Sequence, residues 1–140
     1  MDPAPLLLAV LWAAWLLVML FHVELGLMPL FHGSSVEMQS RVPVGRLPTI
    51  FLSMLVYFLL PVFAMLLAAH ACTEPEGWSA SSGWRAFQFV LATVYTVTNL
   101  VHLVADIRIP DSRFDQVVLM AVLTFIGLLL NWQAWLWWAP

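Results

Sequence analysis

Five polar or ionisable residues follow a helical spacing between positions 84 and 109. They are Gln88, Tyr95, Asn99, His102 and Asp106, separated by seven, four, three and four residues. On an α-helix this spacing places all five on one stripe. Imidazole, carboxylate and amide groups on one stripe can bind a metal ion, transfer protons or hydrogen-bond a neighbouring helix. The stripe is therefore the first candidate site in the chain.

A second polar pair, His22 and Glu24, lies in the first apolar run of the chain. Counting residues from the outer end of each run puts His22 and His102 at depths that differ by only a few Å. We therefore expect two histidines and two carboxylates, Glu24 and Asp106, to meet at one level. His22 and Glu24 are two residues apart, which is roughly 200° around an ideal helix. Both can face one neighbour only if the helix unwinds locally, and Pro29 offers a reason for unwinding.

Several ligands suit such a cluster. Two histidines with one or two carboxylates, drawn from His22, Glu24, His102 and Asp106, match the ligand sets of iron, zinc and manganese. Either carboxylate can also orient an imidazole from outside the coordination sphere. The pattern therefore predicts a transition-metal site as one alternative.

A tetrapyrrole is a second alternative. His22 and His102 on facing helices can ligate haem axially, or each can hold a chlorophyll-type macrocycle, with Asn99 and Tyr95 beside it. The spacing of the residues does not separate a tetrapyrrole from a metal ion.

Two further interpretations need no cofactor. His102, Asp106 and Glu24 can act as general acids and bases on a lipid-soluble substrate. Alternatively, Asn99, His102 and Asp106 hydrogen-bond across helices and hold a membrane bundle together, a common use of polar residues in lipid.

The composition indicates where these residues are placed. Hydrophobic residues make up 63% of the 140 positions and charged residues 9%, and the mean hydropathy is +0.93. A water-soluble globule would have too few polar side chains to cover itself, so the sequence predicts an all-α integral membrane protein. Five arginines and no lysine stand against eight acids, a net charge of −3, which argues against nucleic-acid binding.

Motifs that the chain lacks narrow the functions further. One cysteine, Cys72, excludes an intrachain disulfide and a multi-cysteine zinc site. The sequence contains no phosphate-binding glycine loop, no H-E-x-x-H and no nucleophile elbow. Nucleotide-driven transport and two-cysteine redox exchange are thereby excluded.

Four apolar runs are long enough to cross a bilayer, since about 20 residues are needed. They cover positions 5–30, 48–72, 84–109 and 114–138 and make residues 1–140 a single transmembrane domain. Asp2 precedes the first run where a signal peptide would carry basic residues, so we expect a retained span. Short connections predict an antiparallel four-helix bundle.

Local signals refine the connections and the helix interiors. Ser34 and Glu37 have capping-box spacing and predict a short interfacial helix between the first two spans. Ser112 and Asp115 are placed to cap the fourth helix. Pro29 lies inside the first span, where it removes one helical hydrogen bond.

Other signals concern the second and fourth spans. Pro61 lies in the middle of the second span and is expected to bend it. Thr124, Gly127 and Asn131 share one face of the fourth span and predict a packing seam.

Arginine sets the predicted orientation. The first and third connections carry four of the five arginines, namely Arg41, Arg46, Arg108 and Arg113. The positive-inside rule then places these connections in the cytoplasm and both termini on the opposite side. The outer aromatic belt would contain Trp78, Trp84, Trp132, Trp135, Trp137 and Trp138.

These observations favour an accessory or cofactor-holding subunit of a larger membrane complex, because four spans without a soluble domain leave little scope for independent catalysis. Lipid and other membrane subunits, or a second copy of the chain, are the expected partners. A small membrane-embedded enzyme is the second interpretation. A proton-coupled transporter is the third, since the outer halves of three spans offer almost no polar path.

Overall fold

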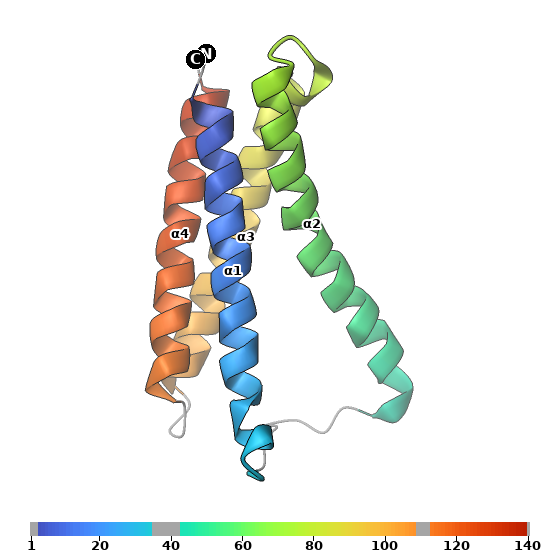
Figure 1. Cartoon of the computed structure of the whole chain (residues 1–140), viewed down its shortest axis with the longest axis vertical. Helices are drawn as coiled ribbons and strands as arrows, with labels where there is room; N and C mark the ends of the chain where they lie inside the picture. Colours follow the sequence, from blue (N-terminus) through green and yellow to red (C-terminus); the bar gives the residue numbers. More distant parts are fainter. Residues whose placement is uncertain (1–2, 35–42, 109–112, 140) are drawn as a thin grey trace.

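The computed structural model describes residues 3–34, 43–108 and 113–139. These residues form four long helices and two short 3-10 helices, and no strand occurs among them (Figure 1). The long helices are α1 (Ala4–Phe31), α2 (Leu47–Thr73), α3 (Ser82–Arg108) and α4 (Phe114–Trp138). The 3-10 helices are η1 (Val44–Arg46) and η2 (Trp78–Ala80).

All four long helices are long and apolar enough to cross a membrane. The prediction of an all-helical chain with four candidate spans is thereby confirmed. The described helix ends lie within two residues of the predicted ends, and the predicted end of the third span at position 109 lies outside the described residues.

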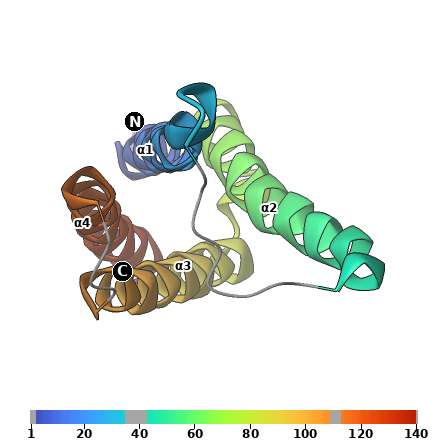
Figure 2. The same cartoon turned by 90° about the horizontal axis from the view of Figure 1, so that it is seen from below.

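Helices α1, α3 and α4 form the closely packed part of the structure, in which α4 contacts both α1 and α3. Helix α2 packs on α1 and leans away from the others toward its first residues (Figure 1). Seen along the bundle, the start of α2 lies apart from α1, α3 and α4 (Figure 2). We call the end where α1 starts and α4 finishes the Trp137 end, and the other the Arg113 end.

The core of the Trp137 half is aromatic. Trp12, Trp15 and Tyr95 are buried, and the ring of Tyr95 lies 5.6 Å from Trp12, 5.1 Å from Trp15 and 4.7 Å from Tyr57. The contacts of Tyr95 with Trp12 and Trp15 are edge to face, and such aromatic pairs stabilise by about 0.5–1.5 kcal/mol beyond the area that they bury. The cluster joins α1, α2 and α3.

Gln88 connects the same three helices through hydrogen bonds. The indole N–H of Trp12 donates to Oε1 of Gln88 at 3.1 Å, and Nε2 of Gln88 donates to the Ala64 carbonyl at 2.8 Å. Gln88 is fully buried. Two members of the polar stripe of α3, Gln88 and Tyr95, therefore hold the bundle together.

Both prolines inside the long helices release a backbone carbonyl that another helix satisfies. Pro61 has no N–H for the Tyr57 carbonyl four residues earlier, and the Tyr95 hydroxyl donates to that carbonyl at 2.5 Å. Pro29 likewise frees the Leu25 carbonyl, which accepts a 2.9 Å hydrogen bond from Nη1 of Arg113. Because each freed carbonyl finds a side-chain donor elsewhere in the chain, both helices continue through proline without an unpaired acceptor.

A polar seam joins α3 to α4, as predicted for Gly127 and Asn131. Nδ2 of Asn131 donates to the carbonyls of Ala92 at 3.2 Å and Gly127 at 2.9 Å. The hydroxyl of Thr93 donates to Oδ1 of Asn131 at 2.6 Å. A Cβ at Gly127 would lie 2.7 Å from Oγ1 of Thr96, closer than carbon and oxygen can approach without a shift. Glycine is needed here for the close approach of α3 and α4.

The predicted caps have different outcomes. The interfacial helix expected at Ser34 and Glu37 extends into residues 35–42, which lie outside the described part of the chain, as does Ser112. Helix α4 has Arg113 at its N-cap position and no side-chain cap. The cap expected from Asp115 is therefore wrong, because its carboxylate instead accepts hydrogen bonds from the Arg113 guanidinium at 3.0 and 2.7 Å.

Replacing Tyr95 by phenylalanine is expected to destabilise the folded protein by about 1–3 kcal/mol, because the buried Tyr57 carbonyl loses its donor. In a Pro61→Ala background, residue 61 regains its N–H and can donate to the Tyr57 carbonyl. Tyr95→Phe should then lower the free energy of unfolding by at least about 1 kcal/mol less than it does in the unsubstituted protein. Unfolding of the four variants in mild detergent measures this coupling. Additive effects of the two substitutions would contradict the role assigned to the Tyr95 hydroxyl.

Gly127→Ala is expected to destabilise the protein by about 1–3 kcal/mol, because the new methyl group overpacks the seam against Thr96. Gly83→Ala is the matched control, since a Cβ there meets nothing within 4 Å. Thermal unfolding in detergent compares the two. Equal melting temperatures for both variants would show that α3 and α4 do not approach this closely.

Candidate metal centre

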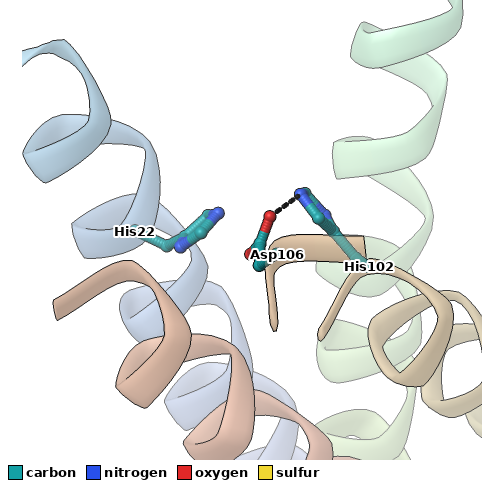
Figure 3. Close-up of side chains that lie close together, drawn as sticks. All are labelled: His22, His102 and Asp106. Carbon is teal, nitrogen blue, oxygen red and sulfur yellow. Dashed lines mark ion pairs between the residues drawn. The ribbon is translucent and has the colours of Figure 1, made fainter. Parts of the chain in front are cut away.

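The structure brings together three of the predicted site residues: His22 from α1, and His102 and Asp106 from α3 (Figure 3). One potential ligand atom from each lies within 4.8 Å of the others. Nε2 of His102 lies 3.6 Å from Oδ1 of Asp106. The rings of His22 and His102 meet edge to face with centroids 5.5 Å apart. The expected meeting of α1 and α3 at matched depth is thus what the structure shows.

The burial of the three residues is unequal. His22 is 9% and Asp106 8% exposed, whereas the side chain of His102 is 52% exposed. Oδ2 of Asp106 is buried and has no hydrogen-bond partner in the described part of the chain. A buried carboxylate oxygen without a partner is unfavourable, and a bound cation would remove that penalty.

Gln116, in the first turn of α4, fixes the ring of His22. With its amide oriented to satisfy both polar atoms, Nε2 donates to Nδ1 of His22 at 2.8 Å and to the His22 carbonyl at 3.2 Å, while Oε1 accepts from the Gly26 N–H at 3.1 Å. Because Nδ1 accepts a hydrogen bond in this arrangement, the neutral ring carries its hydrogen on Nε2. Nε2 is then the nitrogen available to the cluster.

A cavity of about 670 Å³ adjoins the cluster and is lined by His22, Asn99 and His102 among others. Its remaining walls come from α1, α2, Thr98 of α3 and Gln116 of α4. The two histidines thus face a space large enough for a small molecule.

Two predicted residues do not join the cluster. Glu24 is exposed and is not among the three residues whose ligand atoms converge, in keeping with the 200° that separates it from His22. Tyr95 is buried in the aromatic core and does not line the cavity. Asn99 lines it, and its Nδ2 makes a long 3.4 Å hydrogen bond to the Leu123 carbonyl.

Gln116 and Arg113 have a place in the site that sequence reasoning missed. Arg113 ties the start of α4 to the Leu25 carbonyl, which belongs to the same peptide group as the Gly26 N–H that Gln116 binds. A signal for this contact does exist in the sequence, because Pro29 leaves the carbonyl four residues earlier without a donor. Gln116 carries no comparable signal.

The arrangement fits a metal ion with open coordination positions. Ligand atoms in a tetrahedral zinc or iron site are about 3.3 Å apart, so the three atoms need to close by about 1.5 Å, which side-chain rotation can supply. Two imidazoles and one carboxylate form the ligand set of many catalytic metal sites, which keep further positions for water or substrate.

Comparison of the chain with protein-family models, with curated proteins and with solved structures gives no significant match. The site is therefore interpreted from its own geometry.

In metal-free protein, His22 is expected to be the neutral Nε2–H tautomer, because Gln116 donates to Nδ1. ¹⁵N chemical shifts of histidine-labelled protein in detergent identify the tautomer. Gln116→Leu should abolish this preference, whereas Gln133→Leu near the Trp137 end of α4 should leave it intact. An Nδ1–H tautomer in the unsubstituted protein would show that the Gln116 amide has the opposite orientation.

Proposed function

We propose that this protein is an integral membrane protein of four antiparallel spans that holds one divalent transition-metal ion on His22, His102 and Asp106. The observation that carries the proposal is the convergence of one ligand atom each from His22, His102 and Asp106. The Asp106 carboxylate also has one buried oxygen, Oδ2, without a hydrogen-bond partner among the described residues. Ionisable groups within a membrane are costly and usually functional. A metal ion would satisfy all three at once.

The exposed surface supports membrane insertion. Large apolar side chains face outward along the helices, among them Leu17 at 59%, Val90 at 57% and Phe125 at 61% exposure. Such a surface is stable in hydrocarbon and unfavourable in water. Arg46, Arg108 and Arg113 lie at the Arg113 end, so the positive-inside rule supports a cytoplasmic location for this end and for the metal.

The geometry favours a metal ion over a tetrapyrrole. Axial ligation of haem by His22 and His102 needs a flat macrocycle between the two rings, and the edge-to-face contact at 5.5 Å leaves no slot for one. Two nitrogen ligands and one oxygen ligand suit iron(II), zinc or manganese.

A membrane-embedded enzyme is the second candidate, favoured by the exposure of His102 to the cavity. There the 3.6 Å pair of His102 and Asp106 can exchange a proton with a substrate, with or without a metal. A proton-coupled transporter fits less well, because Trp12 and Trp15 fill the bundle in the Trp137 half. Membership of a larger complex stays a prediction, since lipid and a partner helix cover apolar faces equally well.

Metal binding is tested on purified protein that has been stripped with a chelator and titrated with Zn²⁺ and Co²⁺. We expect one equivalent to bind. His102→Ala and Asp106→Leu should each weaken binding by more than about 100-fold, because one of three protein ligands is lost. His32→Ala is the matched control, since this histidine is exposed and outside the cluster. Binding that is absent, or unaffected by both cluster substitutions, would overturn the proposal.

Gln116 provides a second readout of the same site. Metal on Nε2 of His22 requires the proton to move to Nδ1, so Zn²⁺ should convert His22 from the Nε2–H to the Nδ1–H tautomer. Gln116→Glu should then tighten binding by about tenfold or more, because a carboxylate accepts from both Nδ1–H and the Gly26 N–H. Weaker binding in Gln116→Glu would show that Nε2 of His22 is not a ligand.

A further inference from the structure

The cavity beside the metal centre has two chemically different walls. Met19, Met54 and Phe58 supply apolar surface from α1 and α2, and Asn99 and His102 supply hydrogen-bonding groups from α3. Its volume of about 670 Å³ is within the range of small-molecule sites. Apolar walls with a few convergent polar groups are typical of a site for a mainly apolar ligand with a polar head.

The cavity is open to its surroundings on the side of α2. Met54 lines it and is 47% exposed, and His102 lines it with 52% of its side chain exposed. Met54 lies seven residues into α2, or about 10 Å from the start of the helix. In a membrane this depth is occupied by lipid chains, so a lipid-soluble molecule can enter between α2 and its neighbours without crossing water.

The polar groups of the cavity indicate a neutral head. Arginine is absent from its described lining, and the chain has no lysine. Apart from a metal ion on His22 and His102, the described walls therefore offer no permanent positive charge to balance a phosphate. The amide of Asn99 and the imidazole of His102 can each hydrogen-bond a hydroxyl or carbonyl oxygen.

A partner helix does not fit this space. A helix with its side chains is about 10–12 Å across and rises 1.5 Å per residue, so each residue takes about 120–170 Å³. The cavity would hold about four to six residues by this measure, little more than one turn. A single hydrocarbon chain is far thinner and can follow the wedge between α1 and α2.

We propose that the cavity binds a neutral single-chain lipid, with a hydroxyl or carbonyl head at Asn99 and His102 and its chain along Met19, Met54 and Phe58. This inference deepens the proposed function, since the head lies beside the metal ligands His22 and His102 and within reach of the open positions of a bound ion. The class of substrate or bound molecule is then a long-chain alcohol, aldehyde or ketone.

The test uses the full chain in phosphatidylcholine nanodiscs and a long-chain fatty alcohol that carries a diazirine. After irradiation, mass spectrometry locates the labelled residues. We expect saturable labelling of α1 and α2 residues at the cavity, competed by the unmodified alcohol. The matching alkane without a hydroxyl should label about tenfold less, because it gains no hydrogen bond at the head.

Two tryptophan variants separate the cavity from the general lipid surface. Met54→Trp fills the cavity and should lower labelling by about tenfold, whereas Leu55→Trp adds the same bulk to a neighbouring exposed residue outside the lining and should leave it unchanged. Unsaturable labelling, equal labelling in both variants, or labelling spread evenly over α4 would overturn the proposal. Equal labelling by alcohol and alkane would overturn the assignment of the head.

The metal and the lipid are distinguished by measuring both on the same variants. Met54 is not a metal ligand, so Met54→Trp should bind Zn²⁺ as the unsubstituted protein does while losing the alcohol. If the labelling is saturable and depends on the head group in a protein that binds no metal, the proposed lipid site is supported and the proposed metal site is contradicted. If the protein binds metal but shows no saturable labelling, the metal site is supported and the lipid site is contradicted.

Discussion

Pro61 cannot donate the hydrogen bond that a helix requires at its position, so the Tyr57 carbonyl must find another donor. The Tyr95 hydroxyl supplies it, and Gln88 adds a bond to the Ala64 carbonyl about two turns further along. These two side chains attach α2 to α3 at Tyr57 and Ala64, on either side of Pro61. Before Tyr57, the side chains of α2 make no hydrogen bond to another long helix among the described residues, and this part of α2 leans outward (Figure 1). The cavity beside His102 opens there.

The polar stripe of α3 therefore divides by depth into two kinds of residue. Toward the Trp137 end its members are satisfied by other helices: Gln88 is bonded on both sides and Tyr95 holds a carbonyl. Toward the Arg113 end, the polar contacts of His102 and Asp106 within the described part of the chain are with each other and with His22. Packing explains the first group fully. The second group has hydrogen-bonding capacity left over, and that surplus is the physical reason for placing the chemistry there.

Much of the site could be predicted from spacing alone, because positions on one helix are fixed by its 3.6-residue period. His102 and Asp106 share a stripe for that reason, and similar residue counts from the outer helix ends placed His22 within a few Å of the same depth. Gln116 could not be predicted in this way, because its contact with His22 depends on how α4 is rotated against α1. The exclusion of Glu24 was foreseeable, since two residues on a helix turn it to the opposite side.

Sequence by itself determined that four helices form, where they begin and end, and which residues share a face, because hydrophobic length and helical period are local properties of the chain. Only the tertiary structure decided which polar residues hold the bundle and which remain free. That division depends on contacts between helices: a hydroxyl opposite the carbonyl freed by Pro61, an amide of α4 beside His22, and a splayed α2 that exposes His102. These contacts join residues far apart in the chain, and no local pattern encodes the relative rotation of two helices.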